Sequence, residues 1–285
     1  MKVLVSEKLV DEKKAFIPIS DRAFLYGDAV FETMRSYGGK VPFLGRHVER
    51  LNNSLNGLKI NCRVSEKTIS GKIIRLLKAN KLADACIKIM ITRGDSEGGV
   101  AVTGKEVPRI VITASASRFY PEKFYSDGMS AVVVNTMKVP SVCLDSGFKT
   151  HNYLNNIAAR LEASAKCADE AIMLNIKEYL CETSVGNLFF VKKGILYTPS
   201  LDCDILPGIT REAVIDAAEK LGIKVKEGKY RIGSLNNAEE CFMTNSIAEI
   251  MPITKIDGKK TGDGKPGTIT QSLHKAYLDG LIFGF

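Results

Sequence analysis

The chain has 285 residues, of which 45% are hydrophobic and 25% are charged, and its formal net charge is +8. This length suffices for two domains, and the composition is that of an ordinary globular protein. No apolar run reaches the roughly 20 residues that cross a bilayer. The opening "MKVLVSEKLVDEKK" lacks the long apolar core and cleavage site of a signal peptide, so we expect a cytoplasmic protein.

Cysteine spacing and charge distribution exclude several classes of protein. Seven cysteines stand singly and only three histidines are present, which fits neither a disulfide framework nor a zinc site. We expect buried, reduced cysteines and no metal. Basic residues are spread along the chain and interleaved with acidic ones, and no zinc-finger or single-strand-binding pattern appears, so a mixed solvated surface is favoured over nucleic-acid binding.

The first third of the chain mixes strands and helices. Leucine and valine recur every three or four residues after Phe43, which predicts an amphipathic helix ending near Gly57. Ser65 is a plausible N-cap of a second helix. The predicted helices cover 43–60 and 65–82, and the predicted strands cover 2–6, 40–44, 85–94 and 108–115.

A polar, aromatic stretch over residues 116–128 lacks any periodicity and contains Pro121 and Gly128. It predicts a linker between a small domain, 1–115, and a larger domain, 129–285. In the larger domain we predict a helix after Lys149, with one buried face formed by Leu154, Ile157, Ala158, Leu161 and Ala165.

Short strands follow that helix closely, as in an antiparallel meander. A further helix is predicted to end at Gly222, and the Gly/Lys-rich stretch "IDGKKTGDGKPG" reads as a surface turn that is not a P-loop. The strands of this domain are predicted over 130–136, 170–175, 178–183, 187–194, 195–199 and 240–246.

Two residues carry side chains that could do chemistry. Lys149 stands just before a helix, where its amine could act as a nucleophile if burial or a nearby cation lowers its pKa, or could simply extend into water. Glu182 lies on an apolar strand, where a buried carboxylate needs a partner. That partner could be a pyridinium nitrogen or an ordinary lysine.

Two further places could bind a phosphate. The first is the helix start at Ile209 and Thr210, where free backbone N–H groups attract anions, although Thr210 could simply cap the helix. The second combines Arg50 with Ser246 in the turn "TNS". The guanidinium could grip a phosphate or lie at the surface, and the hydroxyl could bind it or close the turn.

These positions occur in the order seen in one family. The segments "SDRAFLYGDAVFETMR", "HVERL", "KTHNYLNNIAARLEA", "CETSVGNLFFVKKGILYTP", "ILPGITREAV" and "FMTNSIAEIMPI" span almost the whole chain. In them the chain resembles the class IV aminotransferases, the fold type IV enzymes of pyridoxal 5'-phosphate (PLP). The resemblance implies a two-domain α+β or α/β fold with a small α/β N-terminal domain, a larger C-terminal pseudo-barrel domain, and a homodimer.

The resemblance also implies residue roles. Lys149 would bind the PLP aldehyde covalently and move the substrate's α-proton, Tyr153 would contact the phenolic oxygen, and Glu182 would pair with the ring nitrogen. The phosphate would be bound by Arg50, Ile209, Thr210 and Ser246. The residues implied to contact substrate are Tyr26, Phe31, Arg93 and Ile247.

Several reactions remain open within this family. We favour amino-group transfer between a branched-chain or related amino acid and a 2-oxo acid. "VFETMR" and "MTNSIAEI" are more similar to 4-amino-4-deoxychorismate lyase, which eliminates pyruvate to give 4-aminobenzoate. A D-amino-acid aminotransferase is disfavoured because "DSEGGVAV" replaces the Arg-x-His carboxylate trap, leaving Arg93 as a carboxylate holder by proximity alone. A non-catalytic anion- or nucleic-acid-binding protein is the remote alternative.

Overall fold

The computed structural model describes residues 1–96, 99–116 and 120–283. The chain divides into two compact units. Unit 1 comprises Met1–Arg118 and Phe148–Asn152, and unit 2 comprises Phe119–Gly147 and Tyr153–Phe285. The division falls within the stretch 116–128 that we predicted as a linker. Residues 117–119 of that stretch lie outside the described residues, and helix α4, Glu122–Ser126, lies inside it.

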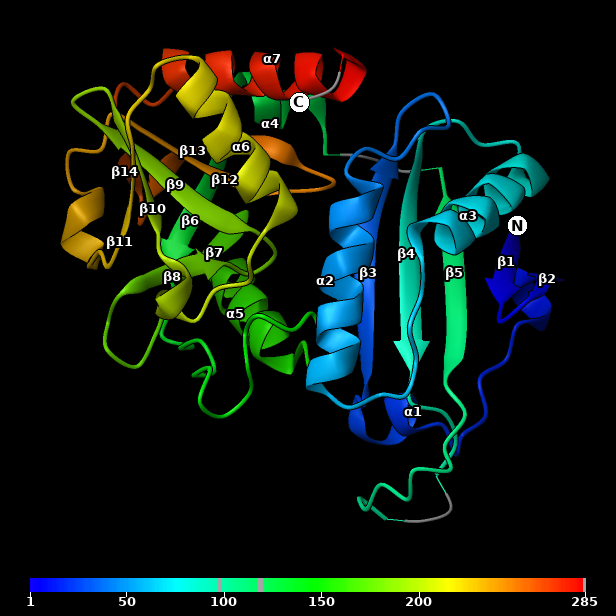
Figure 1. Ribbon diagram of the computed structural model, residues 1–285. Coiled ribbons are helices and arrows are strands. Elements are labelled where there is room, and N and C mark those ends of the chain that lie inside the picture. The colour runs from blue at the N-terminus through cyan, green and yellow to red at the C-terminus, as the bar shows by residue number, and fades with distance from the viewer. Residues whose placement is uncertain (97–98, 117–119, 284–285) are drawn as a thin grey trace. The chain divides into compact units, whose positions relative to one another are not determined.

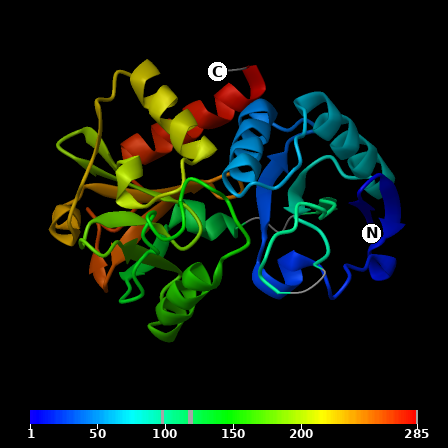
Figure 2. The same cartoon turned by 60° about the horizontal axis from the view of Figure 1, so that its bottom comes forward.

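Unit 1 is an antiparallel five-stranded sheet with two helices on one face (Figures 1 and 2). The strand order is β2-β1-β5-β4-β3, so β3 is an edge strand. On β4 the alternate residues Ile87, Ile89 and Ile91 are fully buried, as expected of a strand with one face toward the core. The elements are β1 Lys2–Val5, β2 Lys8–Asp11, η1 Glu12–Lys14, α1 Arg22–Tyr26, β3 Ala29–Ser36, α2 Leu44–Gly57, α3 Glu66–Asn80, β4 Ala85–Thr92 and β5 Arg109–Ser115.

Both predicted helices of unit 1 are confirmed as α2 and α3, and Ser65 accepts the capping hydrogen bond from the Thr68 N–H. The predicted strand over 40–44 is wrong. Phe43 has a left-handed backbone conformation (φ 54°), and α2 already begins at Leu44. Strand β3 is absent from our predictions because six of its eight residues are buried, which removes the alternation that marks a half-exposed strand.

Unit 2 is built on a mixed nine-stranded sheet in the order β11-β10-β9-β12-β13-β6-β7-β8, with β14 beside β13. A bridge between Glu182 of β8 and Asn187 of β9 closes β9, β12, β13, β6, β7 and β8 into a ring, the pseudo-barrel. The elements are β6 Met129–Val133, α5 Leu154–Ala165, β7 Glu170–Leu174, β8 Leu180–Thr183, β9 Asn187–Lys192, β10 Ile195–Pro199, η2 Leu201–Cys203, α6 Ile209–Lys220, β11 Val225–Gly228, η3 Ile232–Leu235, β12 Glu240–Asn245, β13 Glu249–Ile256, β14 Lys259–Lys260 and α7 Thr268–Phe283.

The predicted antiparallel meander is confirmed from β7 to β10. The sheet also contains parallel pairs, β6 with β7, β6 with β13 and β10 with β11, which short-range patterns do not reveal. Strand β13 and helix α7 were not among our predictions. Among the residues that the structure describes, no helix is both long and apolar enough to cross a membrane.

Helix α5 forms where predicted, but its predicted buried face is wrong. Leu154 is 80% exposed and Leu161 is 66% exposed, and the other three residues of that face are exposed as well. The helix instead packs through Ala159 and Ala163 against strands of unit 2. Small alanines allow close approach of the helix to the sheet, whereas the larger apolar residues form an uncovered stripe.

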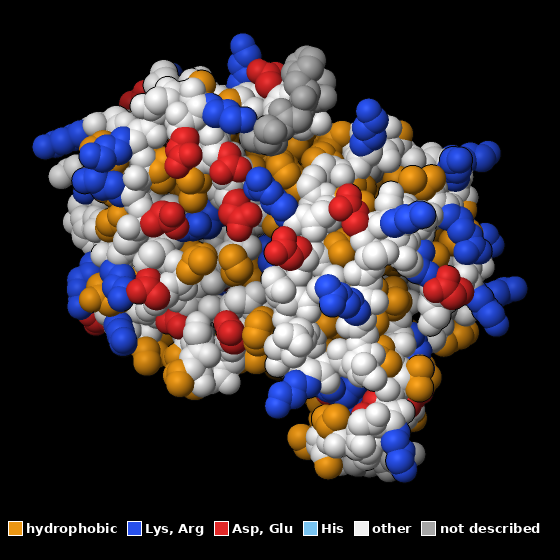
Figure 3. Space-filling model, viewed as in Figure 1, with side chains coloured by type: hydrophobic (Ala, Val, Ile, Leu, Met, Phe, Trp, Pro, Cys, Tyr) orange, Lys and Arg blue, Asp and Glu red, His pale blue; other side chains and the backbone are white. Residues whose placement is uncertain are grey.

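The cysteine prediction is correct only in part. Cys181, Cys203 and Cys241 are buried, but Cys143 and Cys167 are exposed, and all seven are free thiols. The prediction of a mixed charged surface agrees with the face shown in Figure 3, where basic and acidic side chains are interspersed.

A buried cluster of charged groups connects α2 to β3. The Glu32 carboxylate accepts hydrogen bonds from Arg50 Nε and Nη2, each 2.8 Å long, and lies 2.8 Å from His47 Nδ1. All three side chains are buried. Burial alone would raise the pKa of the Glu32 carboxyl, but the attraction and hydrogen bonds of Arg50 and His47 outweigh it and lower that pKa to about 2.

This cluster predicts that the loss of stability caused by Glu32→Gln depends on pH. At neutral pH the variant should lose about 3–5 kcal/mol of unfolding free energy, because Arg50 remains buried without its carboxylate. The folded-state pKa lies below the ordinary 4.5, so the pair stabilises the folded chain above about pH 4.5, and this contribution disappears as pH falls toward 2. The stability gap between wild type and variant should therefore narrow over that range.

Urea unfolding at a series of pH values measures this gap. Glu49→Gln, on the exposed side of the same helix, is the control. A gap between wild type and Glu32→Gln that stays constant from pH 6 to pH 3 would contradict the proposed origin of the stabilisation.

Candidate functional site

Lys149 belongs to a short segment that pairs with the edge of the unit 1 sheet. The Phe31 N–H donates to the Lys149 carbonyl (2.9 Å) and the His151 N–H donates to the Ala29 carbonyl (3.0 Å). The segment thus satisfies backbone groups on the otherwise free edge of β3. Although the predicted large domain spans 129–285, residues Phe148–Asn152 therefore group with unit 1.

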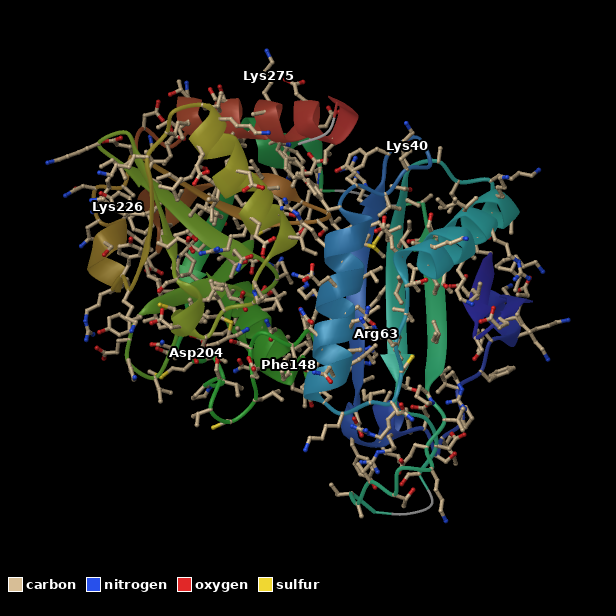
Figure 4. All side chains as sticks on the ribbon, viewed as in Figure 1. Lys40, Arg63, Phe148, Asp204, Lys226 and Lys275 are labelled. Atoms are coloured by element: carbon tan, nitrogen blue, oxygen red, sulfur yellow. The ribbon has the colours of Figure 1, made fainter. Side chains whose placement is uncertain are left out.

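Two further contacts fix the backbone of Lys149. Its N–H donates to the Ser54 hydroxyl of α2 (3.1 Å). The neighbouring Phe148, labelled in Figure 4, packs so closely on Gly57 that a Cβ there would lie 2.1 Å from its ring. Gly57 is therefore needed for this approach. The base of the lysine side chain is held in place while its long stem can still move.

The amine of Lys149 lies over an aromatic ring. Its Nζ is 4.5 Å from the centroid of Phe31, and Lys88 Nζ of β4 is 4.6 Å from the same centroid. Burial lowers the pKa of Lys88, and the nearby charge of Lys149 lowers it further. The described residues give Lys88 no ion pair with an acidic side chain. Our sequence predictions missed Lys88 because nothing in the pattern of β4 distinguishes it from an ordinary surface lysine.

Glu182 lies on β8, where the barrel closes, and is 6% exposed. Its Oε1 accepts a 2.5 Å hydrogen bond from Lys138 Nζ, and its Oε2 accepts from the Leu206 N–H (3.2 Å) and from Asn187 Nδ2 (3.4 Å). A lysine partner was one of the two alternatives open in the sequence. Lys138 and Glu182 are 44 positions apart in the sequence, which explains why no local pattern revealed this pair.

Asn187 connects the candidate residues of unit 2. It pairs with Glu182 across β8 and β9 and with Thr244 across β9 and β12. Its Nδ2 also donates to the Leu206 carbonyl (2.9 Å). A Cβ at Gly208 would lie only 1.9 Å from Asn187 Oδ1, so the residue before α6 must lack a side chain.

Helix α6 begins beside Asn187 at Ile209 and Thr210, both buried. Within the described structure no side chain caps this N-terminus, so Thr210 does not act as the simple cap that the sequence left open. The first N–H groups of an α-helix have no partner within the helix, and they attract anions.

Strand β12 and the turn after it carry two hydroxyl side chains, Thr244 on the strand and Ser246 in the turn. Asn245, rather than Ser246, closes this turn, because its Oδ1 accepts from the N–H groups of Ile247 (2.9 Å) and Ala248 (2.7 Å). Thr244 Oγ1 is buried without a hydrogen-bond partner in the described part of the chain. An unpaired buried hydroxyl costs free energy, which a polar ligand would recover.

The other residues that were implied to contact substrate already contact protein groups in unit 1. Tyr26 is 39% exposed and lies under Arg22, whose guanidinium carbon is 5.1 Å from the ring centroid. Phe31 is buried and supports the two lysines. Arg93 pairs with Asp28 (2.7 Å) and donates to the carbonyls of Leu58 and Lys59, so its guanidinium has a structural role in unit 1.

The residues present fit a phosphate-bearing pyridine. Unit 2 places a buried carboxylate, an uncapped helix N-terminus and an unpaired hydroxyl around Asn187. In unit 1 the backbone of Lys149 is held by hydrogen bonds, and the Arg50 guanidinium is buried beside Glu32. Tyr153 stands immediately before α5 in unit 2.

Comparisons with known proteins show which proteins this chain is similar to. Residues 29–256 match the family model described as amino-transferase class IV. The chain is 34% identical to a D-alanine aminotransferase of Listeria innocua, covering 99% of this chain and 96% of that protein. It is 33% identical to an aminodeoxychorismate lyase of Bacillus subtilis, covering 98% and 96%.

Among solved structures, a branched-chain amino acid aminotransferase of Escherichia coli superposes with a TM-score of 0.95 at 29% identity, covering 98% of this chain and 94% of that one. This match confirms the predicted two-domain fold with its pseudo-barrel. The chain belongs to the class IV aminotransferase family.

Proposed function

We propose that the protein is a PLP-dependent aminotransferase that moves an amino group between a branched-chain or related amino acid and a 2-oxo acid. The observation that carries the proposal is the Lys149 amine, which stands over Phe31 on a backbone held by β3 and Ser54. Membership of the class IV family supports it. The similarity to a branched-chain aminotransferase structure over nearly the full chain supports the substrate class.

Each candidate residue would have one role toward a PLP molecule. Lys149 would bind it covalently and, once released by an incoming amine, take the α-proton from the substrate and return it. Bound PLP supplies an electron-withdrawing ring that stabilises negative charge on the substrate's α-carbon. Glu182 would face the ring nitrogen and Tyr153 the phenolic oxygen. The phosphate would be held by Arg50, the Ile209 N–H, Thr210 and Ser246.

The lyase is the second candidate function. The similarity to an aminodeoxychorismate lyase covers 98% of the chain, at an identity within one percentage point of that to the D-alanine aminotransferase. Both reactions begin with loss of the proton on the carbon that bears the substrate's amino group. The Lys149 amine would therefore serve either reaction. The choice therefore depends on which substrates the protein accepts.

We propose Lys88, in place of Arg93, as the group that meets a substrate carboxylate. Arg93 already donates to Asp28 and two carbonyls. The Lys88 ammonium stands over the same ring as Lys149 and lacks an acidic partner among the described residues. A partly buried cation of this kind is stabilised by an anion that binds beside it.

Half-reactions distinguish the candidate functions. Holoenzyme mixed with an L-amino acid should change the absorbance of its bound cofactor and release the 2-oxo acid, and 2-oxoglutarate should reverse the change. Lys149→Ala should slow both steps by at least roughly 10²–10⁴-fold, whereas Lys166→Ala, on the surface of unit 2, should have no effect. Release of pyruvate and 4-aminobenzoate without such cycling would establish the lyase instead.

Lys88→Met tests the carboxylate contact. Loss of a hydrogen bond to a charged group costs about 1.5–3 kcal/mol, so KM for the 2-oxo acid should rise roughly 10- to 100-fold, with a smaller change in kcat. Lys78→Met, on the exposed side of α3, is the control. An unchanged KM would remove Lys88 from the substrate site.

We also propose a homodimer in which a second copy covers the α5 stripe, formed by Leu154, Ile157, Ala158, Leu161 and Ala165. Burying such a stripe is favourable by about 25 cal/mol per Å². Leu161→Glu should shift the sedimentation mass toward the 31.2 kDa of one chain, while Leu221→Glu, at an exposed leucine outside the stripe, should not. A wild-type protein that sediments as a single chain at all concentrations would contradict this proposal.

A further inference from the structure

The backbone around Lys138 is held rigidly although it belongs to no helix or strand. The Lys138 N–H donates to the Leu174 carbonyl at the end of β7 (2.8 Å). The Asn155 side chain of α5 accepts from the Val139 N–H (3.2 Å) and donates to the Met137 carbonyl (2.8 Å). Both neighbours of Lys138 are therefore fixed to α5, and Lys138 itself is fixed to the sheet.

The side chain of Lys138 is as constrained as its backbone. It is 12% exposed, and its Nζ lies 2.5 Å from Glu182 Oε1. Burial alone would lower the pKa of Lys138, but the attraction of Glu182 outweighs it and the pKa is raised. The lysine therefore carries its positive charge throughout the neutral range, and the pair is a buried ion pair of zero net charge.

The other carboxylate oxygen is held by groups next to the start of α6. Leu206, whose N–H donates to Glu182 Oε2, stands three residues before Ile209. Glu182 is thus fixed on one side by a full positive charge and on the other by neutral amides. A second cation that approaches this carboxylate must share it with Lys138.

We propose that Lys138 is a positioning residue that holds Glu182 and sets the strength of its interaction with the ring nitrogen of PLP. This proposal rests on the proposed role of Glu182. A carboxylate that already neutralises an ammonium attracts a protonated nitrogen less strongly, because the two positive charges repel each other. Lys138 would keep that attraction moderate and would hold the Glu182 carboxylate in place before PLP binds.

The experiment compares PLP with its 1-deaza analogue, in which a CH group replaces the ring nitrogen. The ratio of the two dissociation constants, measured by fluorescence titration of the apoprotein, reports the interaction at the nitrogen alone. Lys138→Met should increase the preference for PLP over the analogue by roughly tenfold, because the Glu182 carboxylate then no longer interacts with the Lys138 ammonium as well as with the ring nitrogen. Lys138→Arg, which keeps the charge, should leave the ratio near the wild-type value.

Control variants distinguish a failure of this proposal from a failure of the proposed function. Lys166→Met, in an exposed pair with Glu162 (3.0 Å), should not change the ratio. If Lys138→Met weakens PLP and the analogue equally, Lys138 only maintains the structure and the proposal is overturned. Glu182→Gln should abolish the preference, and if it does not, Glu182 does not face the nitrogen. Failure of the wild-type protein to bind PLP at all would instead overturn the proposed function.

Discussion

The free edge of β3 is the constraint on which the candidate site of unit 1 depends. A strand at the edge of a sheet carries backbone groups that need partners, and here the segment Phe148–Asn152 provides them. Because the pairing fixes the register, it also decides which residue lies beside Phe31. Lys149 occupies that position, so backbone hydrogen bonds place the base of its side chain beside Phe31, and its Nζ lies 4.5 Å from the centroid of that ring.

Each unit also contains a buried carboxylate that forms an ion pair with one of the cations described above. In unit 1 Glu32 binds Arg50 with His47, and in unit 2 Glu182 binds Lys138. Buried ion pairs add little net stability, but breaking one leaves an unpaired charge at high cost. Such pairs therefore fix where charged groups point, which suits a ligand that carries both a phosphate and a basic ring nitrogen.

Much of this organisation could be predicted from the sequence, but not all of it. Helices α2 and α3 follow from periodicity and the Ser65 cap, and the site residues follow from family motifs rather than from local patterns. Periodicity found the apolar face of α5 but could not tell that the rest of this chain leaves it exposed. The ion pair of Lys138 depends on strands that meet only in the folded barrel, and strand β3 is too uniformly buried to show an alternation.

Borohydride reduction of the protein incubated with PLP, followed by peptide mass spectrometry, tests the central claim directly. Three amines compete in this experiment, because Lys88 stands over the same ring as Lys149 and Lys138 lies against Glu182. The arrangement described here predicts a pyridoxyl label on the peptide that contains Lys149 and on neither of the other two. A label on Lys88 or Lys138, with Lys149 unmodified, would contradict it.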